Sequence, residues 1–113
     1  MKKSLLVLIL LIFAQQLYAK EWYQGGSLHG SNLSQWSAAS NNNKLATASD
    51  WIVIVLGDNE VQNMALLKQK ASILVNCIDT LIPTISKSYK PEDTETRATG
   101  LLCITQLHSN GWR

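Results

Sequence analysis

A cysteine or serine beside a histidine can carry out nucleophilic catalysis, and cysteines and histidines are also the usual soft metal ligands; this chain has two of each. They are Cys77, Cys103, His29 and His108, and none of them belongs to a catalytic or metal-binding sequence motif. Cys103 and His108 are five residues apart, which is not a spacing that shares one helix face. We therefore expect two surface histidines, no catalytic residue and no enzymatic activity. A hydrolase that uses His29 or His108 is the alternative.

A group of acidic residues is the other arrangement that could bind an ion. Glu92, Asp93 and Glu95 lie close together in the sequence, as calcium ligands do. The alternating oxygen ligands and the central glycine of a calcium loop are missing, however. Acidic side chains at the start of a helix are stabilised by its dipole, and that role explains all three. We expect no metal site and no cofactor.

The first nineteen residues have the layout of a secretory signal peptide. Lys2 and Lys3 precede the apolar run Leu5–Phe13, and the segment ends on the small residue Ala19. This run is far shorter than the ~20 apolar residues that a membrane-spanning helix needs. Residues 1–19 are therefore expected to be cleaved, and the product to be exported without a membrane anchor.

Export gives the two cysteines a structural role. In an oxidising compartment a lone pair of cysteines usually forms one disulfide. A bond between Cys77 and Cys103 would stabilise the fold by about 3 kcal/mol, by restricting the unfolded chain. Two buried free thiols are the alternative. The helix bounds expected below leave the two residues up to about one and a half turns out of register, so spacing alone does not pair them.

Removing residues 1–19 leaves the chain electrically neutral. Of the ten Lys and Arg residues, Lys2 and Lys3 lie in that segment, which leaves eight basic against eight acidic residues. A nucleic-acid-binding protein normally carries a basic excess clustered on one face. We therefore expect neither nucleic acid nor a membrane surface as the target.

The rest of the chain divides into an arm and a helical domain. Gly25 and Gly26 argue against a regular element, so residues 20–30 are expected to form an irregular N-terminal arm. Residues 31–113 repeat apolar side chains at spacings of three and four, which predicts a single all-α domain, a small bundle of three or four helices. A core of this size contributes only a few kcal/mol of net stability, so a disulfide would matter.

Each expected helix is bounded by residues that cap or break helices. The expected ranges are Ser31 or Asn32 to Ser40, Lys44–Leu56, Asn59–Ile82, and Pro91 to about Asn110. The asparagines at 41–43 are expected to end the first helix, and Pro83 the third. The β-branched tail Trp51–Leu56 could also be a buried strand, but no second strand is available to pair with it.

The apolar faces of these helices predict the core. The third helix has so broad an apolar face that it should pack against two neighbours. The other apolar rows are Leu45, Ala48, Ile52 and Val55 in the second helix, and Ala98, Leu101, Leu102 and Thr105 in the fourth. These rows are expected to face the core.

Four tryptophans are many for a chain of 113 residues. Trp36 and Trp51 fall on apolar helix faces and are expected in the core. Trp22 and Trp112 lie outside the helices, and they either pack together over the bundle or form an exposed aromatic patch with Tyr23. The second alternative makes Trp22, Tyr23 and Trp112 candidate partner-binding residues.

The segments around the first two tryptophans also form a sequence signature. It consists of Trp22–His29 (WYQGGSLH), Trp36–Ser40 (WSAAS) and Asn43–Trp51 (NKLATASDW). This pattern resembles uncharacterised short exported bacterial helical proteins that read GGTLH…W…AS…NKLATAADW. In those chains a CIDE-like segment and a second cysteine in a C-terminal helix follow, as Asn76–Asp79 and Leu102–Ile104 do here. The resemblance brings no activity and no catalytic residues.

A second resemblance concerns architecture alone. Bacterial periplasmic acid-stress chaperones are also small, exported, all-helical and held by one disulfide, although their cysteines lie further apart. We therefore expect a periplasmic, non-enzymatic protein that binds another protein in a stress-response or chaperone-like role. An immunity or inhibitor protein against a periplasmic toxin or hydrolase is the alternative.

Overall fold

The computed structural model describes residues 20–112, so the expected signal peptide, residues 1–19, lies outside the described residues. The described chain forms four α-helices, α2 (Leu33–Ala38), α3 (Asn41–Leu56), α4 (Met64–Ile85) and α5 (Thr96–Ser109). Two short 3₁₀ helices, η1 (Asp58–Gln62) and η2 (Pro91–Asp93), lie between them. The expected all-α bundle is confirmed. None of the described helices is long and apolar enough to cross a membrane.

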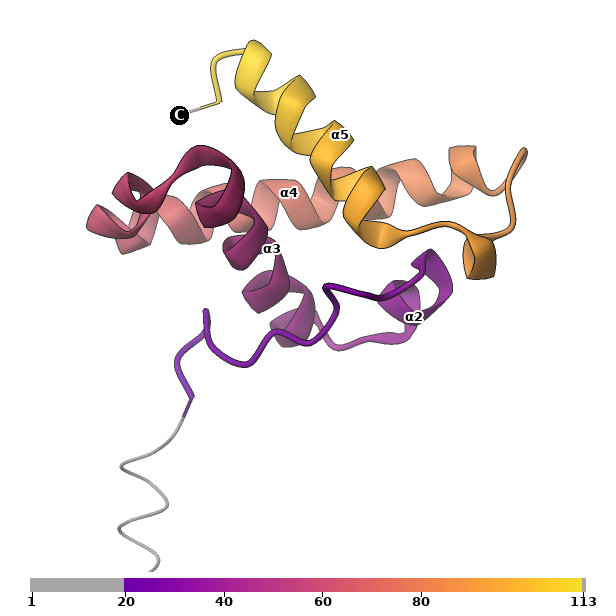
Figure 1. The fold of residues 1–113 in the computed structure, drawn as a ribbon, viewed down its shortest axis with the longest axis horizontal. Helices are drawn as coiled ribbons and strands as arrows, with labels where there is room; N and C mark the ends of the chain where they lie inside the picture. The colour runs from indigo at the N-terminus through magenta and orange to yellow at the C-terminus, as the bar shows by residue number, and fades with distance from the viewer. Residues whose placement is uncertain (1–19, 113) are drawn as a thin grey trace, which may run out of the picture.

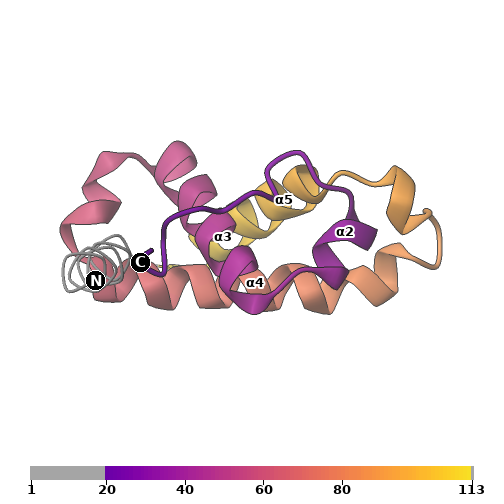
Figure 2. The same cartoon turned by 90° about the horizontal axis from the view of Figure 1, so that it is seen from below.

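The long helix α4 is the base on which the other elements pack (Figure 2). Helices α3 and α5 cross it obliquely, and α2 lies beside η2, the turn that precedes α5 (Figure 1). This arrangement confirms that the broad apolar face of α4 has two neighbours. Trp36 and Trp51 stack in the core with ring centroids 5.8 Å apart, so their expected burial is confirmed. The segment that could have been a strand, residues 51–56, belongs to α3.

The asparagine run is part of a helix, which corrects the expected boundary between the first two helices. Residues 41–43 were expected to end the first helix, but they form the first turn of α3. Ser40 explains the difference because its side chain accepts a hydrogen bond from the backbone N–H of Asn43 and caps the helix. Helix α2 is short and is capped by Asn32, as expected.

Both ends of α4 also differ from the expected range. The chain after Gly57 first forms η1, and α4 begins at Met64 because the Asn63 side chain caps it. Pro83 lies inside the last turn of α4 and does not end it. Proline removes one backbone donor, but the apolar side chains of Ile82 and Ile85 on either side still pack against the core. This packing holds the last turn in place.

Helix α5 begins five residues later than expected, at Thr96. The backbone N–H of Thr96 donates to the carbonyl of Ser31, and that of Leu33 donates to the carbonyl of Thr94. These two bonds form an isolated antiparallel bridge between Asn32 and Glu95. The bridge keeps residues 94 and 95 extended, so the helix cannot start at Pro91. Only the 3₁₀ turn η2 forms there.

The buried face of α5 also differs from the expected one. Its buried residues are Thr96, Thr99, Gly100, Cys103 and Ile104. The expected apolar row is therefore wrong, because Leu101 and Leu102 are exposed. A Cβ on Gly100 would lie 3.1 Å from the ring of Trp51, so the absence of a side chain lets α5 approach α3 closely.

Candidate functional site

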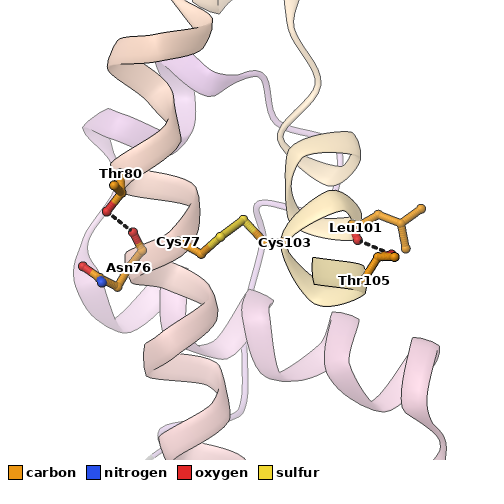
Figure 3. The surroundings of a disulfide bond; sticks show 6 residues. All are labelled: Asn76, Cys77, Thr80, Leu101, Cys103 and Thr105. Carbon is orange, nitrogen blue, oxygen red and sulfur yellow. Dashed lines mark hydrogen bonds between the residues drawn. A yellow bond between two sulfur atoms is a disulfide. The ribbon is translucent and has the colours of Figure 1, made fainter. Parts of the chain in front are cut away.

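The disulfide fixes α5 on α4. Cys77 and Cys103 are bonded, with their Cα atoms 6.1 Å apart, which confirms the expected pair (Figure 3). With the observed bounds, Cys77 lies eight residues before the end of α4 and Cys103 lies seven residues after the start of α5. At 1.5 Å per residue these offsets are about 12 and 10.5 Å. The later end of α4 and the later start of α5 together bring the two cysteines into register.

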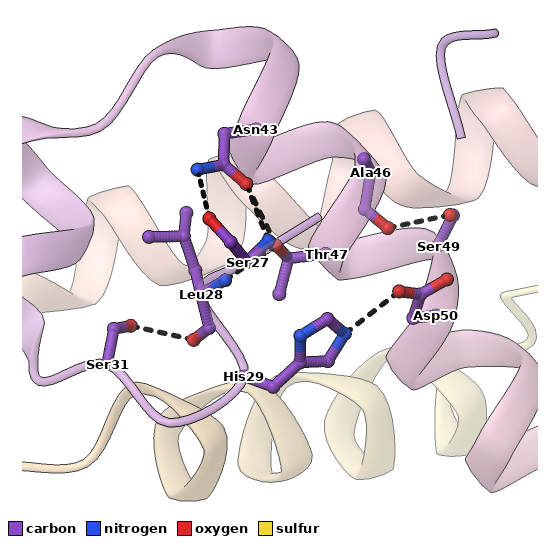
Figure 4. A network of polar contacts seen from close by, with 9 residues as sticks. All are labelled: Ser27, Leu28, His29, Ser31, Asn43, Ala46, Thr47, Ser49 and Asp50. Carbon is purple, nitrogen blue, oxygen red and sulfur yellow. Dashed lines mark hydrogen bonds and ion pairs between the residues drawn. The ribbon is translucent and has the colours of Figure 1, made fainter. Parts of the chain in front are cut away.

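The N-terminal arm lies against α3 and is held there by polar contacts (Figure 4). The backbone N–H of Ser27 donates to the side chain of Asn43, and that of Leu28 donates to the hydroxyl of Thr47. A Cβ on Gly26 would lie only 2.6 Å from the backbone nitrogen of Thr47. Only glycine therefore permits this approach, and it places the next residues, including His29, beside α3.

His29 and Asp50 form a pair at this junction of arm and helix. The Nε2 atom of His29 lies 2.8 Å from Oδ2 of Asp50 (Figure 4). Because a carboxylate only accepts hydrogen bonds, Nε2 carries the proton. The ring of Trp51 meets the imidazole edge-on, at a centroid distance of 6.1 Å, and fixes its orientation.

The neighbours of this pair do not supply an activated nucleophile. Ser31 and Ser49 line hollows next to His29, but each hydroxyl donates to a backbone carbonyl. Both cysteines are in the disulfide. His108 is exposed in the last turn of α5. Within residues 20–112 no three His, Cys, Asp or Glu side chains gather as metal ligands do.

An open apolar groove lies between α3 and α5. We call it the α3–α5 groove; its volume is about 530 Å³. Its lining is Trp51, Ile54, Val55, Ala98, Leu101 and Ile104, with His29, Glu95 and Arg97. Ile54, Leu101 and Val55 leave 73%, 51% and 44% of their surface exposed, so the expected burial of Val55 is wrong as well. Figure 3 shows Leu101 pointing away from the disulfide.

A second groove continues from the first on the other side of His29. We call it the α3–α4 groove; its volume is about 460 Å³. Its lining is Tyr23, His29, Ser49, Asp50, Val53, Ile54, Val61, Met64 and Leu67. His29 and Ile54 belong to both grooves. The two hollows therefore form one surface that is largely apolar and has the His29–Asp50 pair near its middle.

The three aromatic residues expected to bind a partner, Trp22, Tyr23 and Trp112, differ in their exposure. Tyr23 is exposed and lines the α3–α4 groove. Trp22 and Trp112 are partly buried against the core. Lys68 lies over the ring of Trp22 and Lys70 over that of Trp112, each about 5.8 Å from the centroid. Of the three, Tyr23 is thus the residue placed at the candidate site.

Lys70 also ties two segments to the base helix. Its ammonium group lies 2.7 Å from the carboxylate of Glu60 in η1, and these side chains are only 7% and 17% exposed. The ring of Trp112 also lies beside this ammonium. The pair therefore holds η1, beside the α3–α4 groove, and the C-terminal tail on α4.

Comparison with known proteins identifies no relative of this chain. No protein-family model matches the chain, and searches of curated proteins and of solved structures find no match. The resemblance to short exported bacterial proteins stays a prediction.

Proposed function

We propose that this protein is an exported, non-enzymatic factor that binds other proteins in the periplasm in a stress-response or chaperone-like role. The observation that supports it is the surface formed by the α3–α5 and α3–α4 grooves. Ligand-binding surfaces are typically concave and largely apolar, with a few polar groups that orient the ligand. Here the polar groups are His29 and Asp50, between apolar walls.

The aliphatic side chains exposed on this surface carry a free-energy cost that binding of a partner would offset. Leaving Ile54 and Leu101 in water forgoes the ~1.5–3 kcal/mol that full burial of such a side chain gives. A segment of another protein that fills the groove recovers part of this free energy. Contiguous apolar surface of this kind is typical of sites that bind proteins.

A single substitution tests the role of the groove. Leu101→Asp puts a charge on the wall of the α3–α5 groove and should weaken the binding of an apolar fluorescent dye and of an unfolded client by about tenfold or more. Leu102→Asp is the matched control, because Leu102 is equally apolar and exposed on the same helix but lines neither groove. Equal effects of the two variants would contradict the proposal.

The chaperone-like role requires a response to acid as well. We expect dye binding and suppression of client aggregation to increase when the pH is lowered from neutral to acid values. If neither changes, the stress-response part of the proposal is wrong, and the Leu101→Asp variant then tests the groove independently.

One observation favours an immunity or inhibitor protein as the second candidate. The disulfide fixes α5, and the Lys70–Glu60 pair fixes η1, so the walls of both grooves are preorganised. A rigid surface suits one defined partner better than many clients. This candidate predicts a single stoichiometric complex in a pull-down from envelope extract and no protection of unrelated clients.

A further inference from the structure

We propose that the segment bound in the grooves is an apolar peptide with one basic side chain, which pairs with Asp50 where the two grooves meet. This inference rests on the proposed protein-binding function and adds the chemistry of the partner. It follows from the charges around the grooves and from the free oxygen of Asp50.

The charged side chains that line the two grooves are few. They are Asp50, Glu95 and Arg97, with His29 as the neighbouring titratable group and Tyr23 beside it. Glu95 and Arg97 lie 3.9 Å apart, so their opposite charges largely offset each other. With a neutral imidazole, the lining carries one net negative charge, and it belongs to Asp50.

Asp50 has room to accept a further donor. Its side chain is 44% exposed and only Oδ2 is used by His29. In the part of the chain that the structure describes, Oδ1 accepts no hydrogen bond. A lysine or arginine of a partner would meet this oxygen with a charge-assisted hydrogen bond, which is stronger than a neutral one.

The surroundings of Asp50 explain why the rest of the partner should be apolar. Ile54 lies one helical turn after Asp50 and lines both grooves. A bound segment that places its basic residue at Asp50 would therefore have apolar walls on both sides of that residue. An acidic residue at the same place would face a carboxylate, and like charges disfavour binding.

Three synthetic peptides of identical apolar sequence test the inference. They differ only at one central position, which is lysine, glutamine or glutamate, and each carries a fluorescent label for anisotropy measurements with the disulfide-bonded protein. We expect the lysine peptide to bind about twofold to fivefold more tightly than the glutamine peptide, as exposed or partly exposed charge pairs do. The glutamate peptide should bind most weakly.

Two variants assign the preference to one carboxylate. Asp50→Asn keeps an oxygen that accepts from His29 but removes the charge, so it should make the lysine and glutamine peptides equal. The double variant Glu95→Gln/Arg97→Gln is the matched control, because it removes the other two charges of the lining together and leaves the net charge of the lining unchanged, so the lysine preference should stay in place.

The outcomes separate this inference from the proposed function. If Leu101→Asp abolishes binding but the three peptides bind the wild type equally, the groove binds peptides and the role of Asp50 is wrong. A lysine preference that survives Asp50→Asn also overturns it, as does tighter binding of the glutamate peptide. If no peptide binds, both the inference and the proposed protein-binding groove fail.

Discussion

Removing the carboxylate of Glu60 should destabilise the protein more than removing the ammonium group of Lys70. The two groups lie 2.7 Å apart with little exposure to water. At an effective dielectric constant of about 20, their gross attraction is about 6 kcal/mol. Most of it offsets the cost of taking both charges out of water, so the net value of the pair is small.

The two variants should differ in stability because the remaining charge stays buried in one and can reach solvent in the other. In Glu60→Gln the ammonium of Lys70 stays buried between α4 and Trp112, and an uncompensated buried charge costs about 3 kcal/mol or more. In Lys70→Met the carboxylate of Glu60 can turn toward solvent from the short η1 helix, and methionine keeps the apolar contact with Trp112. We expect a loss of only about 1 kcal/mol for this variant.

Urea denaturation followed by far-ultraviolet circular dichroism, with the disulfide intact, measures these losses. A domain of this size has a free energy of unfolding of about 5–14 kcal/mol, so Glu60→Gln should remain folded, with its urea midpoint lowered by about 1–3 M. Adding Lys70→Met to Glu60→Gln should raise the free energy of unfolding again by about 2 kcal/mol, because the unpaired charge of Lys70 is removed. A Glu60→Gln variant as stable as the wild type, or a double variant less stable than Glu60→Gln, would refute this reasoning.

The arm and the disulfide give two further predictions. Gly26→Ala places a Cβ against the backbone of Thr47 and should lower the free energy of unfolding by about 1–3 kcal/mol. Gly30→Ala, which meets nothing within 4 Å, should change it by less than about 0.5 kcal/mol, and equal losses in urea denaturation would contradict the close packing of the arm. Replacing both Cys77 and Cys103 with serine opens a bridge across 26 residues and should cost about 3.5 kcal/mol; unchanged stability under oxidising conditions would contradict the bond.

Local patterns predicted the elements of the fold but not the contacts that set their ends. Apolar spacing correctly predicted four helices and the burial of Trp36 and Trp51, since the period of an α-helix is visible in a single segment. The start of α5 could not be predicted in the same way. It depends on the backbone hydrogen bond between Thr96 and Ser31, which are 65 residues apart, and on the one between Leu33 and Thr94. These bonds override the helix-start signal at Pro91.

The candidate site was not predicted from the sequence either, because it also depends on contacts between residues that are distant in the chain. Leu101 was expected in the core because it belongs to an apolar row of the helix, but the face of α5 that packs on α3 and α4 carries Gly100, Cys103 and Ile104 instead. His29 and Asp50 were each visible in the sequence, but they are 21 residues apart and no motif links them. The double glycine before His29 was the one local signal, because a chain without side chains can run close to a helix.

Three structural restraints surround the α3–α5 and α3–α4 grooves. The disulfide anchors one wall of the α3–α5 groove, the Lys70–Glu60 pair anchors η1 beside the α3–α4 groove, and the Gly26 contact places His29 between them. Between these restraints the protein keeps Ile54 and Leu101 exposed to water. Rigid walls around exposed apolar side chains lower the entropy cost of binding a partner. This combination is what a preformed binding surface requires. Variants that loosen the walls of the grooves should therefore weaken peptide binding as well as lower the free energy of unfolding.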